Sequence, residues 1–109
     1  MKIILNTDSV KKVDQNIRNK ISKELKTWGN KTDDNGYTLY YHSTKSGQWE
    51  DDLFVKPFLN IEKKQIKFCI TKSDGEIIDF EPSFGYLLRR FTEILIVNFS
   101  DQFSSLEFK

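Results

Sequence analysis

The residues best able to do chemistry in this chain are its single histidine, His42, and the acids Glu50, Asp51 and Asp52 that follow it. A histidine can act as a general base near neutral pH, and a neighbouring carboxylate can orient its imidazole. A histidine on a strand surface beside a solvated acidic turn gives the same pattern. Because no paired lysine or second catalytic acid stands out, we expect no enzymatic activity.

Metal centres and nucleophilic sites draw mainly on clusters of histidine and cysteine. Cys69 is the only cysteine, so the chain holds one residue of each type. The sequence contains no Walker loop, dinucleotide-binding fingerprint, CxxC pair, nucleophile elbow or HExxH. Its acids do not follow the spacing of an EF-hand. We therefore expect neither a metal site nor a cofactor.

Two acidic clusters flank residues 37–43. Their members are Asp33 and Asp34 before this segment and Glu50, Asp51 and Asp52 after it. Loop acids of this kind often serve only solubility. Grouped, they could instead mimic phosphate charge and occupy the basic cleft of a nuclease or another nucleic-acid-binding protein.

Aromatic side chains gather in the same region, at Tyr37, Tyr40, Tyr41 and Trp49. Alternation along a strand places Tyr40 on the same side as His42. One side of this strand should pack under helices, and we expect the other to expose Tyr40 and His42. Exposed aromatics could anchor a protein interface or stack on a base, although ordinary packing within a sheet also explains them.

Basic residues concentrate early in the chain. Residues 1–31 carry eight Lys or Arg against three acids, whereas residues 32–62 carry six acids against two Lys. The basic positions of the first predicted helix are Lys11, Lys12, Arg18, Lys20, Lys23 and Lys26. They could contact phosphates, but a solvated helix face explains them as well. A net charge of +1 and a pI near 7.8 lack the strongly basic character of a dedicated nucleic-acid binder.

Apolar spacing predicts two helices that would position these residues. The first begins after the N-cap candidates at residues 7–9 and carries an apolar stripe over residues 10–28, with Gly29 as the C-cap. The second covers residues 83–106, where apolar residues keep helical spacing. Its stretch 93–99 is rich in β-branched residues and could alternatively be a strand.

Alternating apolar and polar residues predict strands. These are residues 2–6, 37–43, 53–61, 66–72 and 76–81, with a polar loop at 29–36 and a turn at 73–75. Pro57 favours an edge position or a bulge. The order β-α-β-β-β-β-α predicts an α+β fold, in which two helices cover one face of an antiparallel sheet of four to five strands.

Chain length, apolar runs and cysteine content indicate the number of domains and the cellular compartment. A chain of 109 residues is expected to form one domain, residues 1–109. No apolar run approaches the roughly 18 residues that span a bilayer, so we expect no membrane insertion. The first residues lack the features of a signal peptide, and a single cysteine forms no internal disulfide. We expect a cytoplasmic protein.

In size, acidic loops, scarcity of catalytic residues and composition, the chain resembles bacterial toxin-immunity proteins, in particular those of contact-dependent growth inhibition. The resemblance implies a protein that binds and neutralises a protein partner, a toxic nuclease or a similar enzyme. The partner-binding residues would be Asp33, Asp34, Tyr40, His42, Trp49, Glu50, Asp51 and Asp52. The alternative is a nucleic-acid-binding module that uses the basic first helix.

Overall fold

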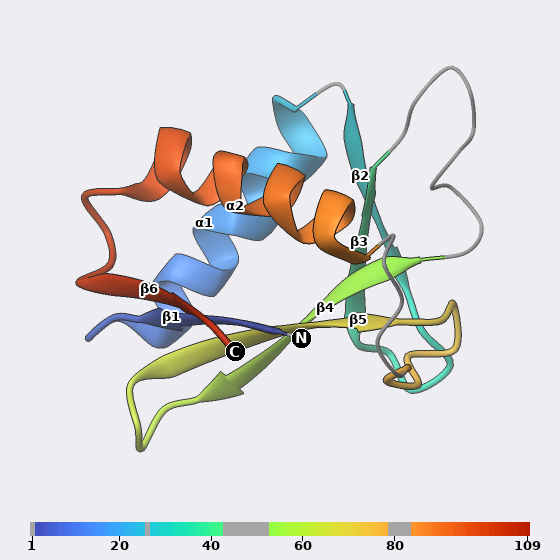
Figure 1. Ribbon diagram of the computed structural model, residues 1–109, viewed down its shortest axis with the longest axis horizontal. Coiled ribbons are helices and arrows are strands. Elements are labelled where there is room, and N and C mark those ends of the chain that lie inside the picture. The colour runs from blue at the N-terminus through green and yellow to red at the C-terminus, as the bar shows by residue number, and fades with distance from the viewer. Residues whose placement is uncertain (1, 26, 43–52, 79–83) are drawn as a thin grey trace.

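The structure, a computed structural model, describes residues 2–25, 27–42, 53–78 and 84–109. Two helices lie on one face of a six-stranded antiparallel sheet (Figure 1). The elements are β1 (Lys2–Asn6), α1 (Val10–Lys23), β2 (Trp28–Thr32), β3 (Thr38–His42), β4 (Phe54–Asn60), β5 (Gln65–Thr71), α2 (Phe84–Phe99) and β6 (Ser105–Phe108). The strand order is β2-β3-β4-β5-β1-β6. The α+β class predicted from the sequence is confirmed, with two strands that the prediction missed.

Helix α1 is shorter than predicted, because it ends at Lys23 and residues 28–32 form the edge strand β2. Trp28 still reaches the core, but from a strand. Gly29 is therefore not a helix cap. A Cβ at Gly29 would lie 2.6 Å from Cζ of Tyr41, so the missing side chain lets the Tyr41 ring lie against β2.

Helix α2 ends at Phe99, and the predicted helix up to residue 106 is wrong. The last segment, Ser105–Phe108, pairs with β1 as an edge strand. The helical spacing misled because Phe103 packs against the core from a turn and Leu106 lies opposite Leu5 in the sheet. Apolar positions three and four residues apart thus continue past the end of the helix by coincidence.

Two other predictions near the second helix are settled by the structure. Residues 93–99 are helical, so the alternative of a strand is wrong. The predicted turn at residues 73–75 is confirmed, with Gly75 at a φ of 87°. Of the strand predicted at 76–81, the described part contributes one isolated bridge, between Ile77 and Thr71. Its last three residues lie outside the described segments.

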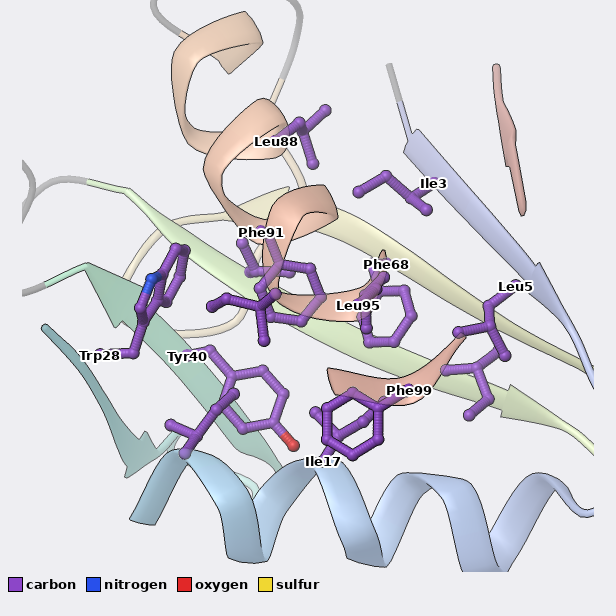
Figure 2. Packing of buried hydrophobic residues seen from close by; sticks show 14 of the residues in the cluster. Ile3, Leu5, Ile17, Trp28, Tyr40, Phe68, Leu88, Phe91, Leu95 and Phe99 are labelled. Atoms are coloured by element: carbon purple, nitrogen blue, oxygen red, sulfur yellow. The ribbon is translucent and has the colours of Figure 1, made fainter. Parts of the chain in front are cut away.

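The main core lies between the sheet and the two helices, and Phe91 of α2 is at its centre. Ring centroids of Trp28, Tyr40 and Phe68 lie 5.5, 5.7 and 4.9 Å from that of Phe91. Figure 2 shows these four rings converging from β2, β3, β5 and α2. Each buried aromatic ring removes on the order of 150–250 Å² from water. This cluster therefore holds both halves of the sheet against α2.

The opposite face of the sheet also buries side chains, namely Leu39, Phe54, Lys56, Cys69 and Thr71. Part of their cover comes from residues 72–78. This segment turns back after β5, pairs with Thr71 through Ile77 and places Gly75 against Asp33 and Lys56. The turn after β5 thereby covers the polar side chains of Asp33 and Lys56.

Strands β3 and β4 stay together only briefly. Tyr40 and Val55 are the one pair between them among the described residues. Beyond this point β4 continues through Pro57 and pairs with β5, where Pro57 lies opposite Phe68. β4 lies between β3 and β5, so Pro57 is not in an edge strand as the sequence favoured. Because no described pair joins β3 and β4 beyond Val55, the missing N–H of Pro57 interrupts no described pairing with β3. The divergence of the two strands leaves room for a recess.

Candidate functional site

A recess of about 580 Å³, here called the β3–β4 recess, opens where these two strands diverge. Its walls include Asp14 and Arg18 of α1, Tyr37 from the turn before β3, and Lys56, Phe58 and Leu59 of β4. Three elements distant in sequence therefore meet at one opening. The charged groups in these walls are held in two ion pairs.

The first ion pair joins Asp33 to Lys56. Oδ1 of Asp33 accepts hydrogen bonds from the backbone N–H groups of Asn35 and Tyr37, each at 2.9 Å, and so shapes the turn between β2 and β3. Oδ2 accepts from Nζ of Lys56 at 2.8 Å. The side chain of Asp33 is 0% exposed and that of Lys56 is 9% exposed. The hydrogen bond from Lys56, aided by the two backbone N–H groups, lowers the pKa of Asp33.

This burial corrects one expectation, because Asp33 does not lie on a solvated loop surface. Further contacts complete its surroundings. The Lys56 ammonium lies 4.7 Å from the ring centroid of Tyr37 and 5.3 Å from that of Phe58. On the other side, a Cβ at Gly75 would collide with Oδ2 of Asp33. The acid is thus a structural group enclosed by three segments of the chain.

The second ion pair lies on α1, where Arg18 donates to Asp14 across one helical turn at 2.7 Å. The side chain of Asp14 is 10% exposed, whereas that of Arg18 is 47% exposed. The hydrogen bond to Asp14 raises the pKa of Arg18. The Asp14 carboxylate therefore fixes part of the guanidinium, and both residues line the recess.

Tyr40, which we expected on an exposed face, is completely buried. The expectation was wrong because this side of β3 faces the helices. Figure 2 shows its hydroxyl oxygen directed toward α1. That oxygen has no hydrogen-bond partner among the described residues. Burial, together with the charge of Asp14, raises the pKa of Tyr40.

His42 also lies on the helix-facing side of β3, and it is half-buried. Its ring packs against Trp28, with centroids 5.0 Å apart. Within the described segments its Nδ1 has no hydrogen-bond partner. Burial lowers the pKa of His42, and the positive charge of Arg90 lowers it further. The imidazole is thus placed among core residues at the end of β3 that is far from Thr38 and the recess.

The remaining predicted site residues separate into two groups. Asp34 is exposed in the turn that leads to Tyr37, and so lies near the β3–β4 recess. Trp49, Glu50, Asp51 and Asp52 lie outside the described residues, and their role stays a prediction. Sequence reasoning did not select Phe58 or Leu59. The proline between Lys56 and Phe58 was the available signal, because it indicated that β4 loses a neighbour there.

The basic face of α1 carries less free charge than its composition indicated. Arg18 is paired with Asp14, and Lys20 lies 2.9 Å from Glu24. In the part of the chain that the structure describes, Lys11, Lys12 and Lys23 form no ion pair. These three are the residues of α1 most available to a phosphate. Lys26 lies outside the described residues.

Within the described segments, no group of three His, Cys, Asp or Glu side chains is arranged to hold a metal ion. No helix in these segments is long and apolar enough to cross a membrane. Comparison of the chain with known protein families, with curated proteins and with solved structures finds no match. The interpretation of function therefore depends on the chain's own residues and geometry.

Proposed function

We propose that this protein is a small inhibitor that binds and neutralises a toxin, as immunity proteins do, and that it docks through the rim of the β3–β4 recess. The observation that carries the proposal is the set of large exposed side chains at this opening. Tyr37 is 59% exposed and Leu59 is 41% exposed, and Arg18, whose side chain is 47% exposed, lines the same opening. Tyrosine and arginine are among the residues that most often dominate binding energy at protein interfaces.

The apolar surface continues along the β4–β5 hairpin. Ile61, in the turn after β4, is exposed like Leu59, and Phe58 is half-buried. Covering such surface contributes roughly 25 cal/mol for each Å² removed from water. Contiguous apolar side chains bordered by polar groups are typical of interaction sites. A partner seated on the recess would cover this hairpin as well.

Acidic residues near the recess would raise the association rate and the selectivity of toxin binding. Asp34 supplies a negative charge in the turn beside the recess, and the predicted contributors Glu50, Asp51 and Asp52 would add to it. A toxin that acts on nucleic acid presents basic residues to phosphates, so acidic groups on its inhibitor accelerate association. Replacing these four acids with Asn or Gln should reduce the association rate, with the larger loss at low salt.

The nucleic-acid alternative has weaker support. It depends on α1, where the ion pairs at Arg18 and Lys20 neutralise part of the positive charge. If Lys11, Lys12 and Lys23 contacted phosphates, binding would weaken steeply with added salt. Affinity for generic DNA or RNA is therefore the outcome that would favour the alternative.

The test begins with affinity capture of the tagged protein from its native host, with nuclease treatment before elution. We expect one stoichiometric protein that remains after nuclease treatment and after raised salt. The captured protein must also be toxic when produced alone, and growth must recover when the present chain is produced with it. Capture of nucleic acid alone, lost on nuclease treatment, would contradict the proposal.

Substitutions at the rim then locate the interface. Tyr37→Ser and Leu59→Glu should each raise the Kd for the captured toxin at least about tenfold, corresponding to about 1.4 kcal/mol. Val97→Ser is the matched control, because Val97 is an exposed apolar residue on α2 outside the recess. Equal effects of all three substitutions, or none from the first two, would place the interface elsewhere.

A further inference from the structure

The charged residues that line the β3–β4 recess, namely Asp14, Arg18 and Lys56, are all held in ion pairs. Asp14 pairs with Arg18 at 2.7 Å, and Asp33 pairs with Lys56 at 2.8 Å. Asp33 is not among the lining residues, but its carboxylate neutralises the charge of Lys56, so the two pairs sum to zero. The Lys56 ammonium also meets the rings of Tyr37 and Phe58. Each cation at the recess thus already has a counterion, and Lys56 has two aromatic neighbours in addition.

This balance determines which kind of group the recess can accept. A charged guest would lose water on entry and find no uncompensated charge to replace it, which is unfavourable for a buried ion. A neutral planar guest loses little hydration and gains contact with Tyr37, Phe58 and Leu59, which line the space. It can also pack against the side chain of Arg18, which lines the recess and whose guanidinium is planar and weakly hydrated.

Oxygen atoms of the lining residues favour a guest with a polar edge. Asp14 and Thr38 both line the recess, and carboxylate and hydroxyl oxygens accept hydrogen bonds. A ring that carries an O–H or N–H would therefore complement this part of the recess.

From these contacts we infer that the β3–β4 recess receives a neutral aromatic side chain, tyrosine or tryptophan, from the bound protein. The inference rests on the proposed function for the source of the ring, but the chemistry of the recess can be tested without the partner. A space of about 580 Å³ is large enough for one such side chain with water around it. The ring would fill the recess while the hairpin around Ile61 contacts the surrounding surface.

The test uses the isolated full chain and three probes, which are indole, acetate and methylguanidinium. Indole is expected to shift the backbone amide resonances of Tyr37, Thr38 and Leu59 in a saturable manner. Acetate and methylguanidinium should leave the same resonances unchanged at equal concentration. Saturable binding of either ion in preference to indole would overturn the inference.

Variants show whether the recess itself binds the probe. Leu59→Glu should abolish saturable indole shifts by placing a charge in the wall, and Leu59→Met, which keeps an apolar side chain, should retain them. Val97→Ser on α2 should also retain them. Dispersed amide spectra confirm that each variant is folded. Indole shifts that persist in Leu59→Glu would contradict binding at the recess.

Failure of this inference can be separated from failure of the proposed function. If indole does not bind while Tyr37→Ser and Leu59→Glu still weaken toxin binding, the interface stands and the aromatic guest is wrong. If indole binds but no toxin is captured, the recess accepts rings and the toxin-binding function is wrong. In a captured complex, one tyrosine or tryptophan of the toxin should raise the Kd at least tenfold when replaced by alanine.

Discussion

The Asp33 carboxylate and the Lys56 ammonium, 2.8 Å apart, connect the β2–β3 hairpin to β4. These parts of the sheet share one described backbone pair, Tyr40 with Val55. The ion pair therefore lies where main-chain pairing is sparse. Lys56 also lines the β3–β4 recess. The ion pair therefore connects the strands and neutralises a charge in the wall of the recess, while Asp33 in addition shapes the hairpin turn.

Substitutions at Asp33 and Lys56 should have coupled effects on the stability of the protein. Lys56→Met leaves the Asp33 carboxylate buried without its cation, so this variant should unfold at a lower urea concentration than the wild type. Asp33→Asn should also be destabilised, because Lys56 then lacks a counterion. The double variant should lose less stability than the sum of the single losses. Urea unfolding followed by circular dichroism measures all four proteins, and strict additivity would contradict the coupling.

The same carboxylate predicts a loss of stability in acid. Its pKa in the unfolded chain is near 3.8, and the folded value is lower. Stability from the ionised form is thus fully present above the unfolded value and is lost as the pH falls through the folded value. The urea midpoint should drop between about pH 5 and about pH 2. Asp33→Asn should flatten this part of the profile, and an unchanged slope would contradict the assignment.

His42 should titrate below its ordinary value of 6.5, because burial and the Arg90 charge disfavour the imidazolium. A depressed folded pKa means that the unfolded chain takes up the proton first. The contribution to stability is therefore intact above 6.5 and falls as the pH decreases from there to the folded pKa. Proton NMR of the imidazole measures this value. Arg90→Gln should raise it, whereas the neighbouring Arg89→Gln should not.

Gly75 and Gly36 form a matched pair for the packing around Asp33. Both have a positive φ, 87° and 86°, so alanine is strained at either position. A Cβ at Gly36 would meet open space, whereas one at Gly75 would meet Asp33. Gly36→Ala should cost about 1–2 kcal/mol of unfolding free energy. Gly75→Ala should cost more, and equal losses in urea unfolding would show that the turn moves aside freely.

Phe91 should be the most sensitive position of α2. It contacts the rings of Trp28, Tyr40 and Phe68, so Phe91→Ala should lose about 3–5 kcal/mol of unfolding free energy. Tyr86 lies on the same helix and is 65% exposed. Tyr86→Ala should stay within about 0.5 kcal/mol of the wild type. Losses of similar size in chemical denaturation would contradict the central place of Phe91.

The elements predicted well were those whose evidence is local. The apolar spacing that begins at Val10 correctly predicted where α1 starts, and the glycine at position 75 correctly predicted a turn. Each pattern reflects contacts within a few residues. Strand β2 escaped detection because the residues Trp28–Thr32 are mostly polar and become a strand by pairing with β3. β6 was hidden because the apolar residues Phe103 and Leu106 continue the helical spacing past Phe99.

The candidate site was harder to predict from the sequence, because its geometry also depends on contacts between residues that are distant in the chain. Alternation placed Tyr40 on one side of β3, but nothing local indicates which side the helices cover. The burial of Asp33 depends on Lys56, 23 residues away, and on the distant turn at Gly75. Charges that cancel in the fold appear in the sequence as separate acidic and basic residues.

The brief contact between β3 and β4 has a mechanical consequence. With Tyr40 and Val55 as their one described pair, the β2–β3 hairpin is attached to the other four strands largely through side chains. Trp28 and Tyr40 pack against Phe91 on the helix-facing side, and Asp33 pairs with Lys56 on the opposite side. A force that pulls the hairpin away from the sheet would therefore be resisted by an aromatic contact on one face and by an ionic contact on the other.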